Sequence, residues 1–222
     1  MTEYRLACEA ARTSPGNPTN LVRLAQACFE GGEYATNKAE RGLFAEQGIT
    51  AAKAALTQNT NSAPAHFYLG LNLGQLARTR GLSALKLVDQ MEHEVLKAQE
   101  LDPWQDHAGP DRILGLLYRD APSIGSVGSR SKARFHLQRA ALLMPDFPEN
   151  RLNLLETYLD WKDRPGTAKE LKATEEMLPK ARQQFSDAEW EANWLDWDAR
   201  FKQAKAKAEK DPRILKTPRE ES

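Results

Sequence analysis

Imidazole binds metal ions and transfers protons near neutral pH, so the histidines are the first residues to test for chemistry. The chain contains His66, His93, His107 and His136. No two of them lie four residues apart with the glutamate that a helical metalloprotease site requires. His93 stands between Glu92 and Glu94, but adjacent residues point in different directions around a helix. We therefore expect no metal ion and no cofactor.

The other patterns that could carry chemistry fail on spacing or surroundings. Glycines precede serine and lysine residues at 125–132, but a phosphate-binding loop needs four residues between its glycines and a preceding strand. Carboxylate pairs such as Glu175 with Glu176 lie in charged stretches typical of solvated helix faces. We expect a protein that is not an enzyme. The weaker alternative is a groove that serves as an active site, with Arg112, His136 and a carboxylate.

Composition excludes several classes of protein. Lys plus Arg and Asp plus Glu both number 31, so no net charge favours nucleic acid or an anionic membrane. Cys8 and Cys28 are too few for a disulfide framework or a zinc site. No apolar run is long enough for a transmembrane helix, and Glu3, Arg5 and Glu9 interrupt any signal-peptide core. The chain as given is expected in the cytoplasm, or in the periplasm if a leader has been removed.

The positions of three prolines indicate repeated helical units. Ala and Leu dominate the chain, and Pro103, Pro145 and Pro179 each follow a small residue by five positions at the expected end of a helix. Pro145 and Pro179 are 34 residues apart, whereas Pro103 and Pro145 are 42 apart. The longer interval places an insertion at the turn-rich stretch 120–130, and a second insertion is expected at 79–82.

A cap is expected after the repeats. Trp190, Trp194, Trp197 and Phe201 recur on one helical face, which favours a helix that covers the last apolar surface over a tryptophan ligand box. The predicted organisation is a single domain over 1–222, with an N-terminal helix and loop at 1–17, repeats at 18–179, a Trp-rich capping helix at 180–201 and a charged helix and tail at 202–222.

Residues 18–179 resemble tetratricopeptide (TPR) repeats in four units of variable length, which implies an all-α, irregular TPR-like superhelix. Within them, residues 70–74, 108–118, 132–137 and 148–152 are similar to the T-component of TRAP transporters (TatT). That resemblance implies association with an extracytoplasmic solute-binding protein, a groove or pore for a ligand, and homo-oligomerisation. The sequence as given departs from that family, because it does not contain the lipoprotein leader that the resemblance leads us to expect.

In that geometry, the first helix of each repeat lines the groove. The side chains nominated for a ligand or partner are Phe67, Leu71, Asn72, Arg112, Leu116, Arg119, Leu152 and Glu156. An apolar strip flanked by Arg112 and Arg119 suits an amphipathic or organic-acid ligand, because guanidinium binds carboxylate. The alternative for Arg112 is an internal salt bridge or a cap on the turn at 106–111. Asn72, if buried, must bond to a neighbouring loop carbonyl or to a ligand.

The predicted function is that of a non-enzymatic TPR-type binding protein, an accessory that associates with a TRAP-type solute-binding protein. The alternative is a self-assembling scaffold that binds a peptide segment, in which the insertions 79–82 and 120–130 mediate self-association. The expected partners are a protein or a small amphipathic ligand, and no nucleic acid.

Overall fold

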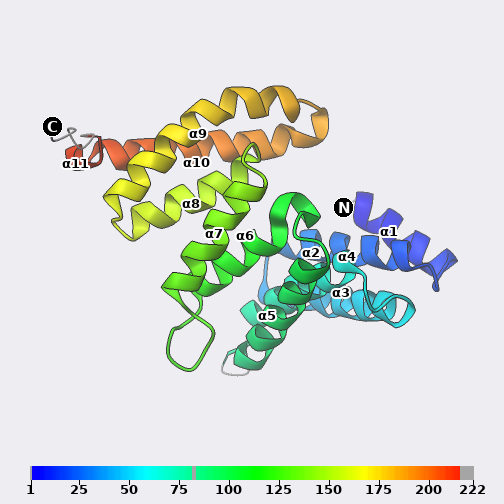
Figure 1. Cartoon of the computed structure of the whole chain (residues 1–222). Helices are drawn as coiled ribbons and strands as arrows, with labels where there is room; N and C mark the ends of the chain where they lie inside the picture. Colours follow the sequence, from blue (N-terminus) through cyan, green and yellow to red (C-terminus); the bar gives the residue numbers. More distant parts are fainter. Residues whose placement is uncertain (1, 82–83, 216–222) are drawn as a thin grey trace. The chain divides into compact units, whose positions relative to one another are not determined.

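The computed structural model describes residues 2–81 and 84–215, and every regular element in these two ranges is a helix (Figure 1). The prediction of an all-α chain is therefore confirmed. Residue 82 of the predicted insertion and residues 216–222 of the predicted tail lie outside the described residues. The chain divides into two compact units, Met1–Ser129 and Arg130–Ser222, and each is considered by itself.

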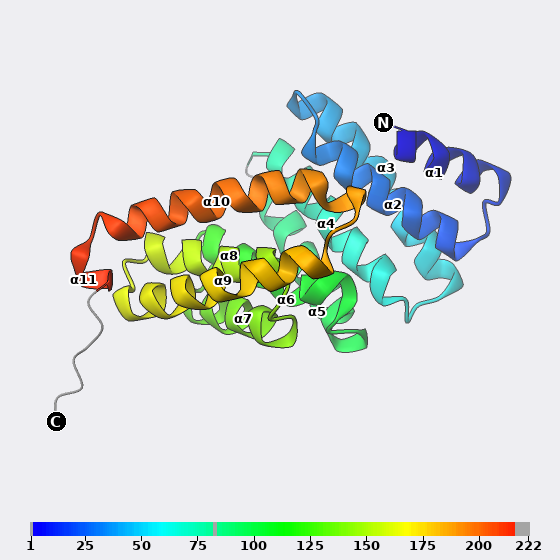
Figure 2. The same ribbon diagram turned by 90° about the horizontal axis from the view of Figure 1, so that it is seen from above.

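Unit 1 consists of helices that pack against their neighbours in the chain (Figures 1 and 2). They are α1 (Thr2–Thr13), α2 (Pro18–Glu33), α3 (Lys38–Gln58), α4 (Ala63–Thr79), α5 (Ala84–Leu101) and α6 (Gln105–Asp120). Helix α4 contacts α2 as well as α3 and α5, so successive helix hairpins stack against one another. This stacking gathers buried side chains of α1 to α5 into one core cluster, because a single amphipathic helix pair cannot bury its apolar face alone.

Polar caps fix where these helices begin. The side-chain oxygen of Asn17 accepts hydrogen bonds from the backbone N–H groups of Thr19 and Asn20, and Pro18 occupies the first turn of α2. Proline is tolerated there because the N–H that it lacks has no partner within the helix. In α4, the Ser62 hydroxyl accepts from the N–H of Ala65. Such caps stabilise a helix by about 1 kcal/mol each.

Glycines allow α4 to approach both of its neighbours. A Cβ atom added at Gly70 would lie 2.5 Å from Val95 Cγ2 and 3.4 Å from the carbonyl oxygen of Met91, both in α5. Helix α4 therefore approaches α5 closely at Gly70. On the other side of α4, a Cβ at Gly48 of α3 would overlap the amide group of Asn72.

Asn72 joins α4 to α2 through its buried amide. It is 0% exposed, and its Nδ2 donates to the carbonyl oxygens of Ala25 in α2, at 2.9 Å, and Tyr68 in α4, at 2.8 Å. The expected hydrogen bond is present, but the expectation of a loop carbonyl was wrong. Both acceptors are helical, because Asn72 lies in the middle of α4 between α2 and α3.

Unit 2 contains α7 (Arg130–Leu143), α8 (Pro148–Asp160), α9 (Arg164–Gln184), a 3₁₀ turn (Ala188–Trp190), α10 (Glu191–Glu209) and α11 (Pro212–Leu215). The expectation that Pro179 ends a helix was wrong, because α9 continues through it to Gln184. Met177, Ala181 and Phe185 flank Pro179 and belong to one buried cluster. Their burial offsets the cost of about 3 kcal/mol for a proline within a helix.

The aromatic residues after Pro179 dock onto α8 and α9. Trp197 is 1% exposed, and the rings of Phe147, Phe185 and Trp194 surround it with centroids 5.5, 6.4 and 5.0 Å away. The indole N–H of Trp194 donates to the Phe185 carbonyl oxygen at 2.6 Å. The Trp-bearing helix expected at 180–201 is α10, which begins at Glu191 and ends at Glu209, whereas residues 180–184 belong to α9.

Candidate functional site

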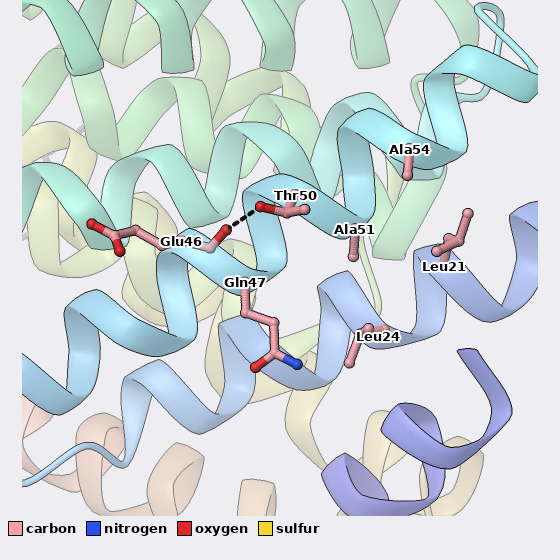
Figure 3. A pocket seen from close by; sticks show the side chains of 7 residues that line it. All are labelled: Leu21, Leu24, Glu46, Gln47, Thr50, Ala51 and Ala54. Atoms are coloured by element: carbon pink, nitrogen blue, oxygen red, sulfur yellow. Dashed lines mark hydrogen bonds between the residues drawn. The ribbon is translucent and has the colours of Figure 1, made fainter. Parts of the chain in front are cut away.

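An open furrow lies between α2 and α3 in unit 1. Its volume is about 390 Å³, and its walls are mainly apolar. Its lining residues are Leu21, Leu24, Glu46, Gln47, Thr50, Ala51 and Ala54. Figure 3 shows the two leucines on α2 beside the α3 row that carries Gln47, Ala51 and Ala54. The furrow is therefore a shallow apolar surface bordered by polar groups, of which Glu46 is charged.

Residue spacing and residue size produce the furrow. Gln47, Ala51 and Ala54 follow one another at intervals of four and three, so they share one face of α3. Two of the three are alanines, and their small side chains leave the space that longer side chains would fill. On α2, Leu21 and Leu24 are three residues apart and each is 8% exposed, so they form a firm wall.

Helix α1 holds the polar end of the furrow in place. The Tyr4 ring packs edge-on against Phe44, 5.1 Å between centroids, and its hydroxyl donates to Gln47 Oε1 at 2.6 Å. Gln47 Nε2 then donates to the Cys8 sulfur at 3.7 Å. Burial, followed by the effect of Cys8, raises the pKa of Tyr4 to about 12, so the phenol keeps its proton. The Gln47 side chain is thus fixed in orientation.

Glu46, the charged residue at the edge of the furrow, already has an ion-pair partner. Arg80 donates to Glu46 at 2.9 Å, and both side chains are about half exposed. The Thr50 hydroxyl donates to the Glu46 carbonyl oxygen at 2.9 Å. A surface ion pair of this kind contributes little to stability. The furrow therefore presents a mainly apolar surface whose charged edge residue already has a partner.

Three of the nominated residues lie inside unit 1. Phe67, Leu71 and Asn72 are 1%, 6% and 0% exposed. Phe67 and Leu71 belong to the core cluster of α2, α3 and α4, because α4 packs against helices on several sides. Their packing stabilises unit 1. A role for these residues in binding stays a prediction.

Arg112 stabilises an unusual turn at the start of α6. Asp106, His107 and Ala108 have φ angles of 50, 54 and 61°, a left-handed conformation that costs a non-glycine residue about 1–2 kcal/mol. Arg112 donates to the Asp106 carboxylate at 2.7 Å and to the carbonyl oxygens of Asp106 and His107 at 3.2 and 3.1 Å. These bonds correspond to the alternative in which Arg112 caps this turn. Arg119 donates to the adjacent carboxylate of Asp120 at 2.6 Å.

The remaining nominated residues are divided between the units. Leu116, in α6 of unit 1, is half-buried. Leu152, in α8 of unit 2, is 0% exposed. Glu156 accepts two hydrogen bonds from Arg200, at 2.9 and 2.8 Å, which join α8 to α10. The eight nominated residues belong to two different units. A groove formed by all of them therefore stays a prediction.

The residues considered for catalysis are also divided, since Arg112 belongs to unit 1 and His136 to unit 2. Within residues 2–81 and 84–215, no group of three or more His, Cys, Asp or Glu side chains could hold a metal ion. In the same ranges, no helix combines the length and the apolar character needed to cross a bilayer.

Comparison with solved structures assigns the fold to the TPR class. The crystal structure of TTC0263, described as a thermophilic TPR protein in Thermus thermophilus, matches with a TM-score of 0.66 and 20% identity, covering 91% of this chain and 89% of that one. The crystal structure of MamA matches with a TM-score of 0.56 and 18% identity, covering 81% and 89%. The predicted TPR-like helical-repeat fold is therefore confirmed. The narrower resemblance to the TRAP T-component stays a prediction.

A more particular likeness concerns the first half of the chain. A family model described as "Regulator of microtubule dynamics protein 1-3" matches residues 2–108, which lie within unit 1. The matched range contains the furrow between α2 and α3. No curated protein matches the chain.

Proposed function

We propose that this chain is a non-catalytic scaffold and that the furrow between α2 and α3 receives an amphipathic helix of a partner protein. The observation that carries the proposal is an open apolar furrow on a TPR-like fold, with two small residues, Ala51 and Ala54, in its wall. Small residues let a partner helix approach closely, and the wall beside them is mainly apolar. A fold alone does not define a function, so the furrow is the feature to test.

Ala54→Arg is expected to reduce capture of the partner at least about tenfold, because a guanidinium in the furrow occupies its space and opposes apolar contact. Ala54 is half-buried at the surface of the furrow, so the variant is expected to fold. Ala39→Arg is the matched control, since it places the same side chain on an exposed position of α3. Quantitative affinity purification from the source cells measures the effect. Equal capture by all three proteins would contradict the proposal.

Association with a TRAP-type solute-binding protein is the narrower proposal that the sequence resemblance supports. An organic acid bound by Arg112 or Arg119 would compete with the carboxylates of Asp106 and Asp120, which these arginines already bind. Co-purification of a solute-binding protein with the chain tests this proposal. Purification of the chain without any such protein, from cells that express one, would count against it.

A second candidate function is binding to microtubules, which the family model matched at residues 2–108 favours. The chain is expected to sediment with polymerised tubulin and to stay in the supernatant without it. Because the match lies within unit 1, substitutions in α10 of unit 2, such as Lys202→Ala, should not change sedimentation. Equal amounts in the supernatant with and without tubulin would remove this candidate.

A further inference from the structure

Helix α10 of unit 2 has one face in the core and the opposite face in solvent. It lies beside α8 and α9 (Figures 1 and 2). Trp194, Trp197, Ala204 and Ala208 belong to the buried clusters that α10 forms with these two helices. Leu195 is 74% exposed. At 3.6 residues per turn, Leu195 lies on the side of α10 that faces away from these clusters.

Small side chains surround Leu195 on the exposed side. Ala192, Ala199 and Ala206 are also exposed, and their spacing of three, four and seven residues places them in line with Leu195. We call these four residues the outer face of α10. Small side chains let a second helix approach closely, and the leucine provides apolar area that such a helix would bury.

The charges along this part of the chain are separated by sign. Residues 187–198 contain five Asp or Glu and no Lys or Arg, whereas residues 199–210 contain five Lys or Arg and one Glu. Glu191, Lys202 and Lys210 are exposed, and within the described residues they form no ion pair. The helix dipole favours this order of charges in a single helix. The dipole gives no reason for an exposed leucine between the two halves.

We infer that the outer face of α10 binds a second copy of this chain, with the two α10 helices antiparallel about a two-fold axis. An antiparallel pair places the acidic half of each helix against the basic half of the other, so the favourable contact occurs twice. A parallel pair would place like charges together. The charge pattern therefore selects both the occupant of this face and its direction.

The sequence also suggests the register of the pair. With the axis near residue 197, Leu195 of each copy faces Ala199 of the other copy, so a large side chain meets a small one. In the same register, Glu191 comes within about 1.5 Å, along the helix axis, of the level of Lys202 in the other copy. The inference adds a partner at α10 and does not depend on the furrow in unit 1.

The association is expected to be weak. One helix from each copy should bury less than the roughly 1,200–2,000 Å² of a stable interface. Dilute protein in an unfolding experiment is therefore expected to be monomeric, and the dimer is expected to form at about 100 µM and above.

The test is sedimentation equilibrium of the full chain from about 5 to 500 µM, over which the parent should pass from monomer to dimer. Leu195→Glu should raise the dissociation constant at least about tenfold, because it places a carboxylate from each copy within the apolar contact. Leu142→Glu is the matched control, since it makes the same change at a leucine of α7 that is 78% exposed. The control should associate as the parent does.

Charge exchange tests the direction of the pair. Glu191→Lys alone and Lys202→Glu alone should each weaken association about threefold or more, because like charges then meet twice. An equimolar mixture of these two variants should associate as well as the parent, since opposite charges face each other again.

Three results would each overturn the inference. The first is a parent that stays monomeric up to about 500 µM. The second is a Leu195→Glu variant that associates as the parent does. The third is a mixture of the two charge variants that associates no better than either variant alone.

Discussion

Replacing Trp197 by alanine is expected to lower the free energy of unfolding of unit 2 by about 3–5 kcal/mol, because the side chain fills the centre of its aromatic core. Trp197 is 1% exposed and contacts Phe147, Phe185 and Trp194, and Trp190 stacks on it with centroids 5.8 Å apart. Truncation removes the largest buried side chain and leaves a cavity among rings that cannot collapse. Hydrogen exchange resolved by peptide should show faster exchange in α8, α9 and α10.

Leu195→Ala is the control for this prediction. Leu195 lies two residues before Trp197 on α10, but it is 74% exposed, so its loss should change stability by less than about 0.5 kcal/mol. Chemical denaturation followed by circular dichroism compares the two variants with the parent. A loss below about 1 kcal/mol for Trp197→Ala would show that the aromatic cluster is not the core of unit 2.

Gly48→Ala is expected to destabilise unit 1 by about 2–4 kcal/mol, although alanine favours a helix more than glycine does. The new Cβ would overlap the Asn72 amide, which is 0% exposed. Moving this amide breaks its hydrogen bonds to Ala25 and Tyr68, so overpacking and a lost buried hydrogen bond add together. Thermal unfolding measures the change.

Gly42→Ala on the same helix should have the opposite sign. The nearest atom to its new Cβ is Thr79 Oγ1 at 3.9 Å, an ordinary contact, so the gain in helix propensity remains. We expect a stabilisation of about 0.5–1 kcal/mol. If both substitutions stabilised the protein, the close approach of α3 to α4 would be contradicted.

The sequence predicted the elements that depend on local signals. Pro103, Pro145 and the spacing of Trp194 and Trp197 act within a few residues, and helices that end before these prolines or carry these tryptophans are present. Glycine within a helix costs about 1 kcal/mol against alanine, and at Gly70 it accompanies a close contact with α5. The fold class was accessible for the same reason.

The candidate site depended on packing between segments that are distant in the sequence. In the sequence, Ala51 and Ala54 look like ordinary core residues. The furrow beside them arises only from the way in which α1 and α2 pack next to α3. The positive φ angles of Asp106 and His107 could not be predicted from these residue types. They depend on hydrogen bonds from Arg112, which lies several residues later in the chain. The signal that could have located the furrow is the alternation of alanine with neutral polar residues on one face of α3.

Photocrosslinking from the furrow tests most directly whether this chain is a scaffold that binds a protein through α2 and α3. A benzophenone amino acid is placed at Thr50, an exposed lining position, and separately at Lys202, an exposed position on α10. The account predicts one discrete adduct with a partner protein from position 50, absent from position 202 and lost when Ala54→Arg is added. No adduct from position 50, or the same adduct from both positions, would contradict it.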